Sequence, residues 1–142
     1  MWIDRGALDD VRQHLTGSYP KEGCGLLLGE VRESGELFVQ CRLPVENRTV
    51  EASAHHRYLI TPDDFRRAER HAKDLGHEVI GVYHSHPDAQ ALPSVHDKEN
   101  AWPWFGYLIL SVVGGGIEEE RAWRLAEDRG DFIELKLKVK ER

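Results

Sequence analysis

The residues with the clearest capacity for chemistry lie in one short stretch, HSHPDAQALPSVHD, at positions 84–97. His84 and His86 are separated by one residue at the end of an apolar run, and side chains two apart on an extended strand lie on the same face. Two imidazoles placed in this way can converge on one metal ion. Asp97 adds a carboxylate, so the stretch offers three ligands of the kinds that zinc accepts. Three protein ligands leave the fourth corner open for water, as in catalytic zinc sites.

Two prolines predict how the chain returns from the histidines to Asp97. Pro87 forces the chain out of the sheet, since proline cannot donate a ladder hydrogen bond. Pro93 stiffens the return, and Ser94 is a natural N-cap for a short helix. Asp97 is then expected in the first turn of that helix, facing back towards the strand end. An isolated His-x-His pair is more often two surface histidines, so the metal interpretation depends on the whole stretch.

A metal-activated water needs a base that takes its proton and passes it to the leaving group. We expect this base to be a carboxylate close to the metal but not bound to it. Glu22 is the best candidate, because it precedes an apolar run in which Gly23 and Gly25 permit close backbone approach. By itself, an acidic residue beside a strand start is an ordinary solvated loop residue. The assignment therefore depends on its combination with the histidine stretch.

Composition limits the classes of function. The chain of 142 residues has about the length of one domain and is 40% hydrophobic and 31% charged, the balance of a soluble globular protein. Its net charge of −6 disfavours a nucleic-acid partner. No apolar run reaches the roughly 20 residues of a membrane span, and no signal peptide is visible. Cys24 and Cys41 are too few for a disulfide scaffold, so we expect a cytoplasmic protein with reduced thiols and no membrane partner.

Hydrophobic periodicity predicts one domain over residues 1–142, with helices and strands interleaved around one sheet. Amphipathic helices are expected over 4–16 and 62–75, the second with Thr61 as N-cap. Strands are expected at 25–31, 36–43, 56–60, 78–84, 107–113, 118–125 and 131–140. This order of elements predicts an α/β or α+β fold with a mixed sheet.

The candidate residues together resemble the JAMM (MPN-plus) metalloprotease motif, in which an upstream Glu is followed by His-x-His-Pro, six residues, Ser, two residues and Asp. Every motif position is filled, by Glu22, His84, His86, Ser94 and Asp97. Three flanking segments are also similar to the short, stand-alone bacterial members of the family: residues 19–29, 81–87 and 104–111. The resemblance therefore covers essentially the whole chain.

The resemblance implies a single MPN/JAMM domain, a mixed β-sheet flanked by helices with cytidine-deaminase-like layering. It implies that one zinc ion and a water are held by His84, His86 and Asp97. Glu22 would be the general acid and base, and Ser94 would help to stabilise the oxyanion. The implied reaction is hydrolysis after the C-terminal Gly-Gly of a small ubiquitin-like or sulfur-carrier protein, releasing cysteine or trimming C-terminal residues. Such a tail can pair with a sheet edge by β-augmentation.

Other interpretations stay open at this point. An isopeptidase that removes a ubiquitin-like modifier from lysine would use the same five residues, so the motif does not separate the two reactions. A non-catalytic MPN scaffold typically lacks zinc ligands or the glutamate, and this chain keeps them all. A cytidine-deaminase-like hydrolase is excluded because no HxE and PCxxC elements are present. The sequence is compatible with either a monomer or a homodimer.

The remaining polar and aromatic residues are given structural roles. Asp88 is expected to be a turn residue, and Cys24 a small buried hydrophobe rather than a nucleophile. Trp104 is assigned to the core, whereas Trp102 could lie in the core or line a substrate groove. Lysines on the last predicted strand are expected to protect an edge: Lys136, Lys138 and Lys140. His14, His71 and His77 are expected on the exposed sides or ends of helices and His96 at the surface, whereas His55 and His56 are expected to be structural or solvent-exposed.

Overall fold

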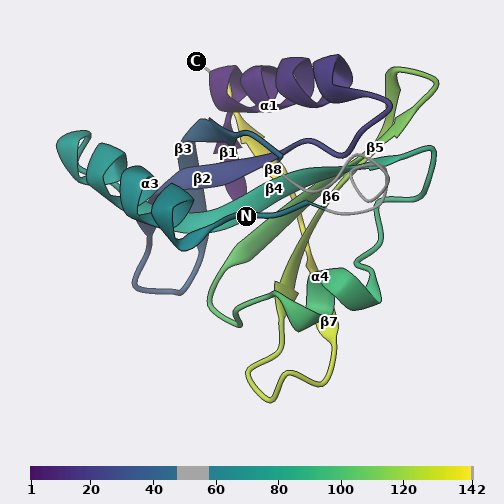
Figure 1. Cartoon of the computed structure of the whole chain (residues 1–142). Coiled ribbons are helices and arrows are strands. Elements are labelled where there is room, and N and C mark those ends of the chain that lie inside the picture. The colour runs from purple at the N-terminus through teal and green to yellow at the C-terminus, as the bar shows by residue number, and fades with distance from the viewer. Residues whose placement is uncertain (48–57, 142) are drawn as a thin grey trace.

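The computed structural model describes residues 1–47 and 58–141, which form one mixed sheet with helices on both faces (Figure 1). The strand order is β7-β6-β5-β4-β2-β3-β1-β8. The elements are β1 (Trp2–Asp4), α1 (Arg5–Ser18), β2 (Cys24–Val31), β3 (Leu37–Val45), α3 (Pro62–Asp74), β4 (Glu78–Pro87), α4 (Val95–Glu99), β5 (Gly106–Val113), β6 (Gly116–Leu125), β7 (Phe132–Leu135) and β8 (Lys138–Lys140). Parallel pairs join β4 with β5 and β1 with both β3 and β8. The predicted mixed α+β sheet is confirmed.

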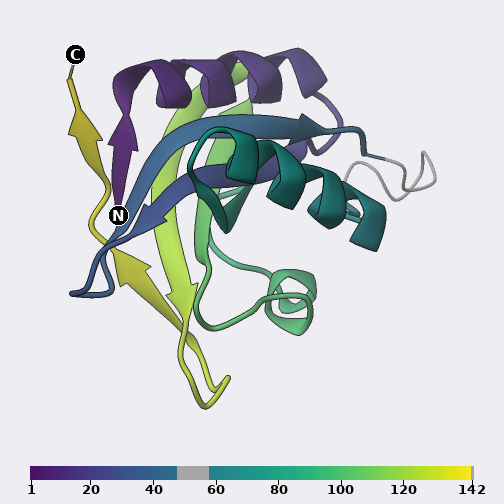
Figure 2. The ribbon, with the colours of Figure 1, turned by 90° about the vertical axis from the view of Figure 1, so that its left-hand side faces the viewer.

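The sheet separates two apolar cores, with α1 on one face and α3 and α4 on the other (Figure 2). The central strand β2 is buried from Cys24 to Gly29, because successive side chains alternate between the two cores. Leu27 packs beneath α1, whereas Leu26 and Leu28 pack on the α3 side. Burial of each such leucine side chain stabilises the folded state by about 1.5–3 kcal/mol relative to an exposed leucine. This rigid centre carries the residues of the candidate site.

The helix ends follow the capping signals of the sequence. The side chain of Asp4 caps α1 by accepting the amide hydrogen of Ala7 at 3.2 Å. Thr61 and Asp64 form a reciprocal capping box at the start of α3, with N···O distances of 2.9 and 3.1 Å. Both predicted long helices are thus confirmed. Among the residues described, no helix has the length and apolar character needed to cross a membrane.

The prediction of one strand over residues 131–140 is wrong. Its first part, β7, pairs with β6 at one edge of the sheet, and its last part, β8, pairs with β1 at the opposite edge. The alternation of apolar and charged residues continues through both strands, but periodicity alone does not identify the partner strand. Lys138 does lie on an edge strand, where its ammonium donates to the Glu36 carboxylate at 2.8 Å.

Four other assignments need correction. Residues 58–60 are not in a strand, and the rest of the strand predicted over 56–60 lies outside the described residues, as does His55. Trp104 is 67% exposed rather than part of the core, and it stacks on the neighbouring Trp102. His14 is half-buried rather than exposed, and its Nδ1 lies 2.7 Å from the hydroxyl of Tyr83, which is buried beneath α1. His96, also predicted at the surface, is half-buried.

Candidate metal and catalytic site

Strand β4 brings its two histidines together, as their spacing predicts. His84 is fully buried and His86 is nearly so, and their Nε2 atoms are 3.2 Å apart. Burial lowers the pKa of His84, which favours a neutral ring with a lone pair to donate. In His86, burial also lowers the pKa, but hydrogen bonds to Asp97 and to the Gln90 carbonyl outweigh it and leave the pKa raised.

Asp97 completes a compact cluster with these histidines. It lies in the first turn of α4, where its Oδ1 is 3.1 Å from Nε2 of His84 and its Oδ2 is 3.2 Å from Nε2 of His86. Burial tends to raise the pKa of the Asp97 carboxyl, but the two histidines and the amide of Ser94 hold it well below its usual range. The site thus combines two imidazoles and one ionised carboxylate, as the sequence predicts.

Glu22 lies beside the cluster. A carboxylate oxygen of Glu22 and one ring nitrogen of each histidine all lie within 4.8 Å of one another. Its Oε2 is buried and has no hydrogen-bond partner among the described residues. Burial raises the pKa of Glu22 to about 8, with opposing effects from His86 and Asp97. A buried carboxylate without a partner fits a neighbouring cation and a role in proton transfer.

Two side chains hold the backbone at Glu22 and Gly23 in place: Ser85 of β4 and Asn47, which follows β3. The Ser85 hydroxyl accepts the amide hydrogen of Gly23 at 2.9 Å, and the amide of Ser85 donates to the Gly23 carbonyl at 3.1 Å. The Asn47 side chain donates to the carbonyl of Glu22 at 2.8 Å. Sequence reasoning missed both residues. The sequence does contain a signal for Ser85. A polar residue between two candidate ligands on a central strand must face a buried environment, where it needs a hydrogen-bond partner.

The turn after β4 is fixed by hydrogen bonds from the β5–β6 hairpin. Ser111 donates to the carbonyl of Ala89 at 2.5 Å, and the indole of Trp123 donates to the carbonyl of Ala91 at 3.1 Å. Between these two anchors, the carbonyl of Gln90 accepts from Nδ1 of His86 at 2.9 Å. Because a carbonyl can only accept, Nδ1 carries the hydrogen, and Nε2 of the neutral ring keeps its lone pair towards the cluster.

Asp88 ties the beginning of this turn to the segment before Glu22. Its carboxylate accepts from the Tyr19 hydroxyl at 2.8 and 2.9 Å and from the amide of Gly114 at 3.0 Å. Its φ of 54° is a left-handed turn conformation, which aspartate tolerates better than most residues. Asp88 is therefore a turn residue, as predicted, and does not belong to the metal cluster.

Ser94 caps α4 and orients Asp97. Its hydroxyl accepts the amide hydrogen of Asp97 at 3.1 Å, while its own amide donates to Oδ2 of Asp97 at 2.8 Å. This reciprocal box fixes the carboxylate that faces the histidines. The Ser94 side chain is exposed, and the cap uses its oxygen only as an acceptor. Its hydroxyl hydrogen thus stays available to a substrate. That Ser94 stabilises an oxyanion stays a prediction.

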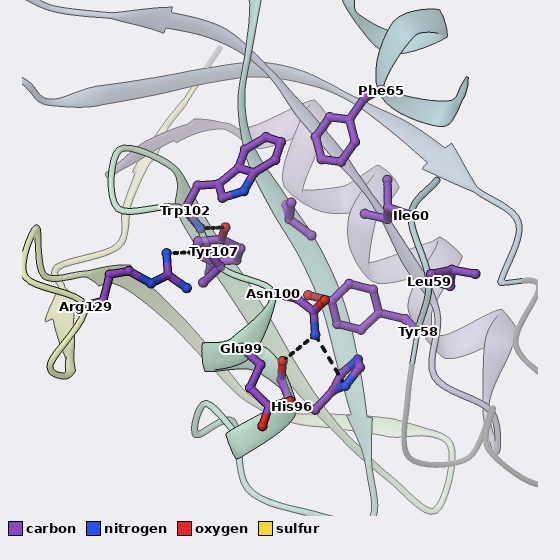
Figure 3. Close-up of a pocket in the computed structure, with 12 residues that line it drawn as sticks. Tyr58, Leu59, Ile60, Phe65, His96, Glu99, Asn100, Trp102, Tyr107 and Arg129 are labelled. Atoms are coloured by element: carbon purple, nitrogen blue, oxygen red, sulfur yellow. Dashed lines mark hydrogen bonds between the residues drawn. The ribbon is translucent and has the colours of Figure 1, made fainter. Parts of the chain in front are cut away.

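A further residue that sequence reasoning missed, Tyr58, covers the cluster. Its ring stacks on that of His84 with centroids 4.4 Å apart, and it meets His96 edge-on at 6.0 Å. Tyr58 is also part of the wall of a pocket of about 310 Å³ beside the cluster (Figure 3). No signal in the sequence marks this contact, because Tyr58 and His84 belong to segments with no regular pairing between them. Cys24 is fully buried next to the site, as expected.

Replacing Ser85 by alanine is expected to lower turnover by about tenfold while the metal stays bound, because the Gly23 amide loses its acceptor and Glu22 loses its support. Steady-state kinetics together with metal analysis measures both effects. Thr16→Ala is the matched control, since among the residues that the structure describes its hydroxyl bonds only within α1, to the Arg12 and Gln13 carbonyls. Unchanged turnover in Ser85→Ala would show that Ser85 does not position Glu22.

Comparison with known proteins identifies related sequences over most of the chain. The profile of the family described as prokaryotic homologs of the JAB domain matches residues 4–126. The desampylase of Haloferax volcanii is 34% identical over 108 residues, which are 75% of this chain and 74% of the relative. The probable TtuB-protein conjugate cleaving protease of Thermus thermophilus is 37% identical over 115 residues, 80% of this chain and 72% of the relative.

Solved structures share the fold along the whole chain. A solution structure of a Salinibacter ruber protein is 41% identical, with a TM-score of 0.77 over 99% of this chain and 92% of that one. A JAB1/MPN domain protein of Archaeoglobus fulgidus has a TM-score of 0.61 at 18% identity, covering 98% of both chains. At that identity the second likeness concerns the fold alone. The predicted MPN-type architecture is confirmed.

Proposed function

The chain belongs to the prokaryotic branch of the JAB (JAMM) hydrolase family, and on that premise we propose that it is a zinc-dependent peptidase acting on ubiquitin-like conjugates. The bond cleaved follows the C-terminal Gly-Gly of a small ubiquitin-like or sulfur-carrier protein. The observation that carries the proposal is the buried cluster of His84, His86 and Asp97 with the unpartnered carboxylate of Glu22 beside it. This donor set suits a three-ligand catalytic zinc site.

Each residue of the site has a separate role in the proposed reaction. His84, His86 and Asp97 would hold the ion, which supplies Lewis-acid polarisation of a carbonyl and acidification of a water. Glu22 takes a proton from the attacking water at its unpartnered oxygen and delivers it to the leaving nitrogen. Burial raises the pKa of Glu22 to about 8 in the metal-free site, and the positive charge of a bound ion would lower it towards the range in which the group both accepts and releases a proton near neutral pH. The Ser94 hydroxyl donates to the developing oxyanion.

Two reactions are compatible with these site residues. One releases a cysteine or a short C-terminal extension after Gly-Gly, and the other cleaves an isopeptide bond to lysine. The second is favoured by the name of the Thermus relative, which describes cleavage of protein conjugates. A scaffold without activity is disfavoured, because all five motif residues are present and four of them converge.

A cleavage assay with two substrates tests the proposal. One is a sulfur-carrier protein whose Gly-Gly end is extended by a single cysteine, and the other is the same carrier joined through Gly-Gly to a lysine side chain. We expect the zinc-loaded protein to cleave at least one of them after the second glycine, as followed by mass spectrometry. Chelation is expected to stop cleavage and added zinc to restore it. Cleavage that survives complete removal of metal would contradict the proposed mechanism.

A further inference from the structure

A third side chain of the β5–β6 hairpin reaches the turn after β4, in addition to those of Ser111 and Trp123. The carboxylate of Glu119 accepts the amide hydrogen of Ala91 at 3.2 Å. The hairpin and the turn lie at the same end of the sheet (Figure 1). Because Ala91 is fully buried, its amide needs a partner within the protein, and Glu119 supplies that partner.

The amide of Ala91 and the carbonyl of Gln90 are the two ends of one planar peptide unit. Its N–H donates to Glu119, and its C=O accepts from Nδ1 of His86 at 2.9 Å. The N–H and C=O groups of a trans peptide point in opposite directions, so the unit bridges the carboxylate and the imidazole. One peptide unit thereby joins a carboxylate on β6 to a candidate metal ligand on β4.

Hydrogen bonds linked through a peptide unit strengthen one another. A carboxylate that accepts from the N–H polarises the peptide and makes its carbonyl oxygen a stronger acceptor. The Gln90 carbonyl then holds the Nδ1–H of His86 more firmly, which fixes the ring and makes Nε2 a stronger metal ligand. A metal-binding histidine often donates to a carboxylate directly, and here one peptide unit lies between the two groups.

The strand register holds this arrangement in place. His86 pairs with Ser111, and Ser111 pairs with Glu119, so the three residues form a row across β4, β5 and β6. Residues paired in this way stand on the same face of a sheet, which here is the face that carries the candidate site. Ser111 and Trp123 bind the carbonyls before and after the Gln90–Ala91 peptide, so the plane of that peptide is fixed from both sides.

The two carboxylate oxygens of Glu119 have different partners. Oε1 accepts from Ala91 at 3.2 Å, whereas Oε2 lies 3.8 Å from Nη1 of Arg121, beyond hydrogen-bond distance. Arg121 is bound more closely by Glu134, through two hydrogen bonds of 2.8 and 2.9 Å. The bond to Ala91 is therefore the contact that fixes the Glu119 carboxylate.

We propose that Glu119 is a positioning residue of the metal site, acting on His86 through the Gln90–Ala91 peptide. It keeps the imidazole turned with Nε2 towards the cluster and strengthens that nitrogen as a ligand. Glu119 itself contacts neither the ion nor the substrate. The inference rests on the proposed function, in which His86 holds the ion, but the chain of hydrogen bonds can also be tested in the metal-free protein.

Glu119→Ala is expected to weaken zinc binding by about tenfold, as measured by competition with a chromogenic chelator. This is the lower end of the 10–100-fold that groups orienting metal ligands contribute, because Glu119 acts through a peptide and its side chain is 36% exposed. Glu119→Gln keeps an oxygen that can accept from Ala91 but lacks the charge, so a smaller loss is expected.

Glu118→Ala is the matched control. Glu118 is the preceding residue of β6 and is exposed, and among the described residues it makes no hydrogen bond to the turn. We expect this variant to keep the zinc affinity of the wild-type protein. Thermal unfolding of all variants without metal confirms that the comparison is between folded proteins.

The tautomer of His86 in the metal-free protein separates positioning from a general effect on stability. When the ring is neutral, two acceptors compete for its one hydrogen: the Gln90 carbonyl at Nδ1 and the Asp97 carboxylate, 3.2 Å from Nε2. Long-range ¹H–¹⁵N NMR at alkaline pH shows which nitrogen carries the hydrogen. Compared with the wild-type protein, Glu119→Ala is expected to have a larger fraction of the Nε2–H form, and Glu118→Ala an unchanged fraction.

The other outcomes separate this inference from the proposed function. Unchanged zinc affinity in Glu119→Ala, or an equal loss in Glu118→Ala, would overturn the inference while the proposed function stands. A loss of zinc affinity without a change in the His86 tautomer would also overturn it, because Glu119 would then support only the stability of the turn. A wild-type protein that binds no zinc would contradict the proposed function itself.

Discussion

Glu22→Gln is expected to bind the metal like the wild-type protein and to hydrolyse substrate about 10²–10⁴-fold more slowly, the usual contribution of a general acid–base group. The amide has nearly the shape of the carboxylate, so the buried site beside His84 and His86 is preserved. What is lost is the ability to take a proton from water and pass it to the leaving nitrogen. The affinity of the substrate is not expected to change greatly, because proton transfer contributes to the transition state.

Single-turnover cleavage and metal analysis of the same preparation measure this prediction. Glu46→Gln is a suitable control, since Glu46 is an exposed glutamate just after β3 and lies outside the metal-ligating group. That variant is expected to retain wild-type rates. Near-normal turnover in Glu22→Gln with bound metal would remove Glu22 from the mechanism and leave the base unidentified.

Asp97→Asn is expected to weaken metal binding by at least about 100-fold, since even outer residues that only orient ligands contribute 10–100-fold. The Asp97 carboxylate lies 3.1 and 3.2 Å from the imidazoles of His84 and His86 and is the one negative charge among the three proposed ligands. Asparagine keeps an oxygen that can accept the Ser94 amide, so the cap of α4 survives. The expected loss of metal affinity therefore reflects the missing negative charge and the missing ligand rather than a loss of folding.

Competition with a chromogenic chelator gives the metal affinity of this variant, and chemical denaturation of the metal-free protein gives its free energy of unfolding. Asp88→Asn is the matched control, because Asp88 lies in the same segment but bonds to Tyr19 and Gly114 instead of the histidines. We expect Asp88→Asn to keep wild-type metal affinity. Equal metal affinity in wild-type protein and Asp97→Asn would exclude Asp97 as a ligand.

The arrangement of the three proposed metal ligands could be predicted from the sequence because it depends on local rules. Two-residue periodicity places His84 and His86 on one face, Pro87 ends the strand, and a serine cap sets the helix that carries Asp97. Each of these rules acts within a few residues, and the structure follows all of them. The Thr61 cap of α3 could be predicted for the same reason.

Features that depend on partners distant in the sequence could not be predicted. The role of Ser85 depends on its position beside Gly23, and that of Tyr58 on its contact with His84. The C-terminal strands β7 and β8 show one continuous alternation yet pair at opposite edges of the sheet. Trp104 was misassigned because a large apolar residue does not reveal whether it packs in the core or lies exposed at a surface.

The central claim is that three side chains hold a catalytic zinc ion, and the most direct test is the metal content of the wild-type protein. Protein purified without chelator and analysed by inductively coupled plasma mass spectrometry is expected to contain about one zinc per chain, the stoichiometry of a three-ligand catalytic site. Under the same conditions Asp97→Asn is expected to contain far less. A folded wild-type protein that neither carries zinc nor takes it up when zinc is supplied would contradict the claim.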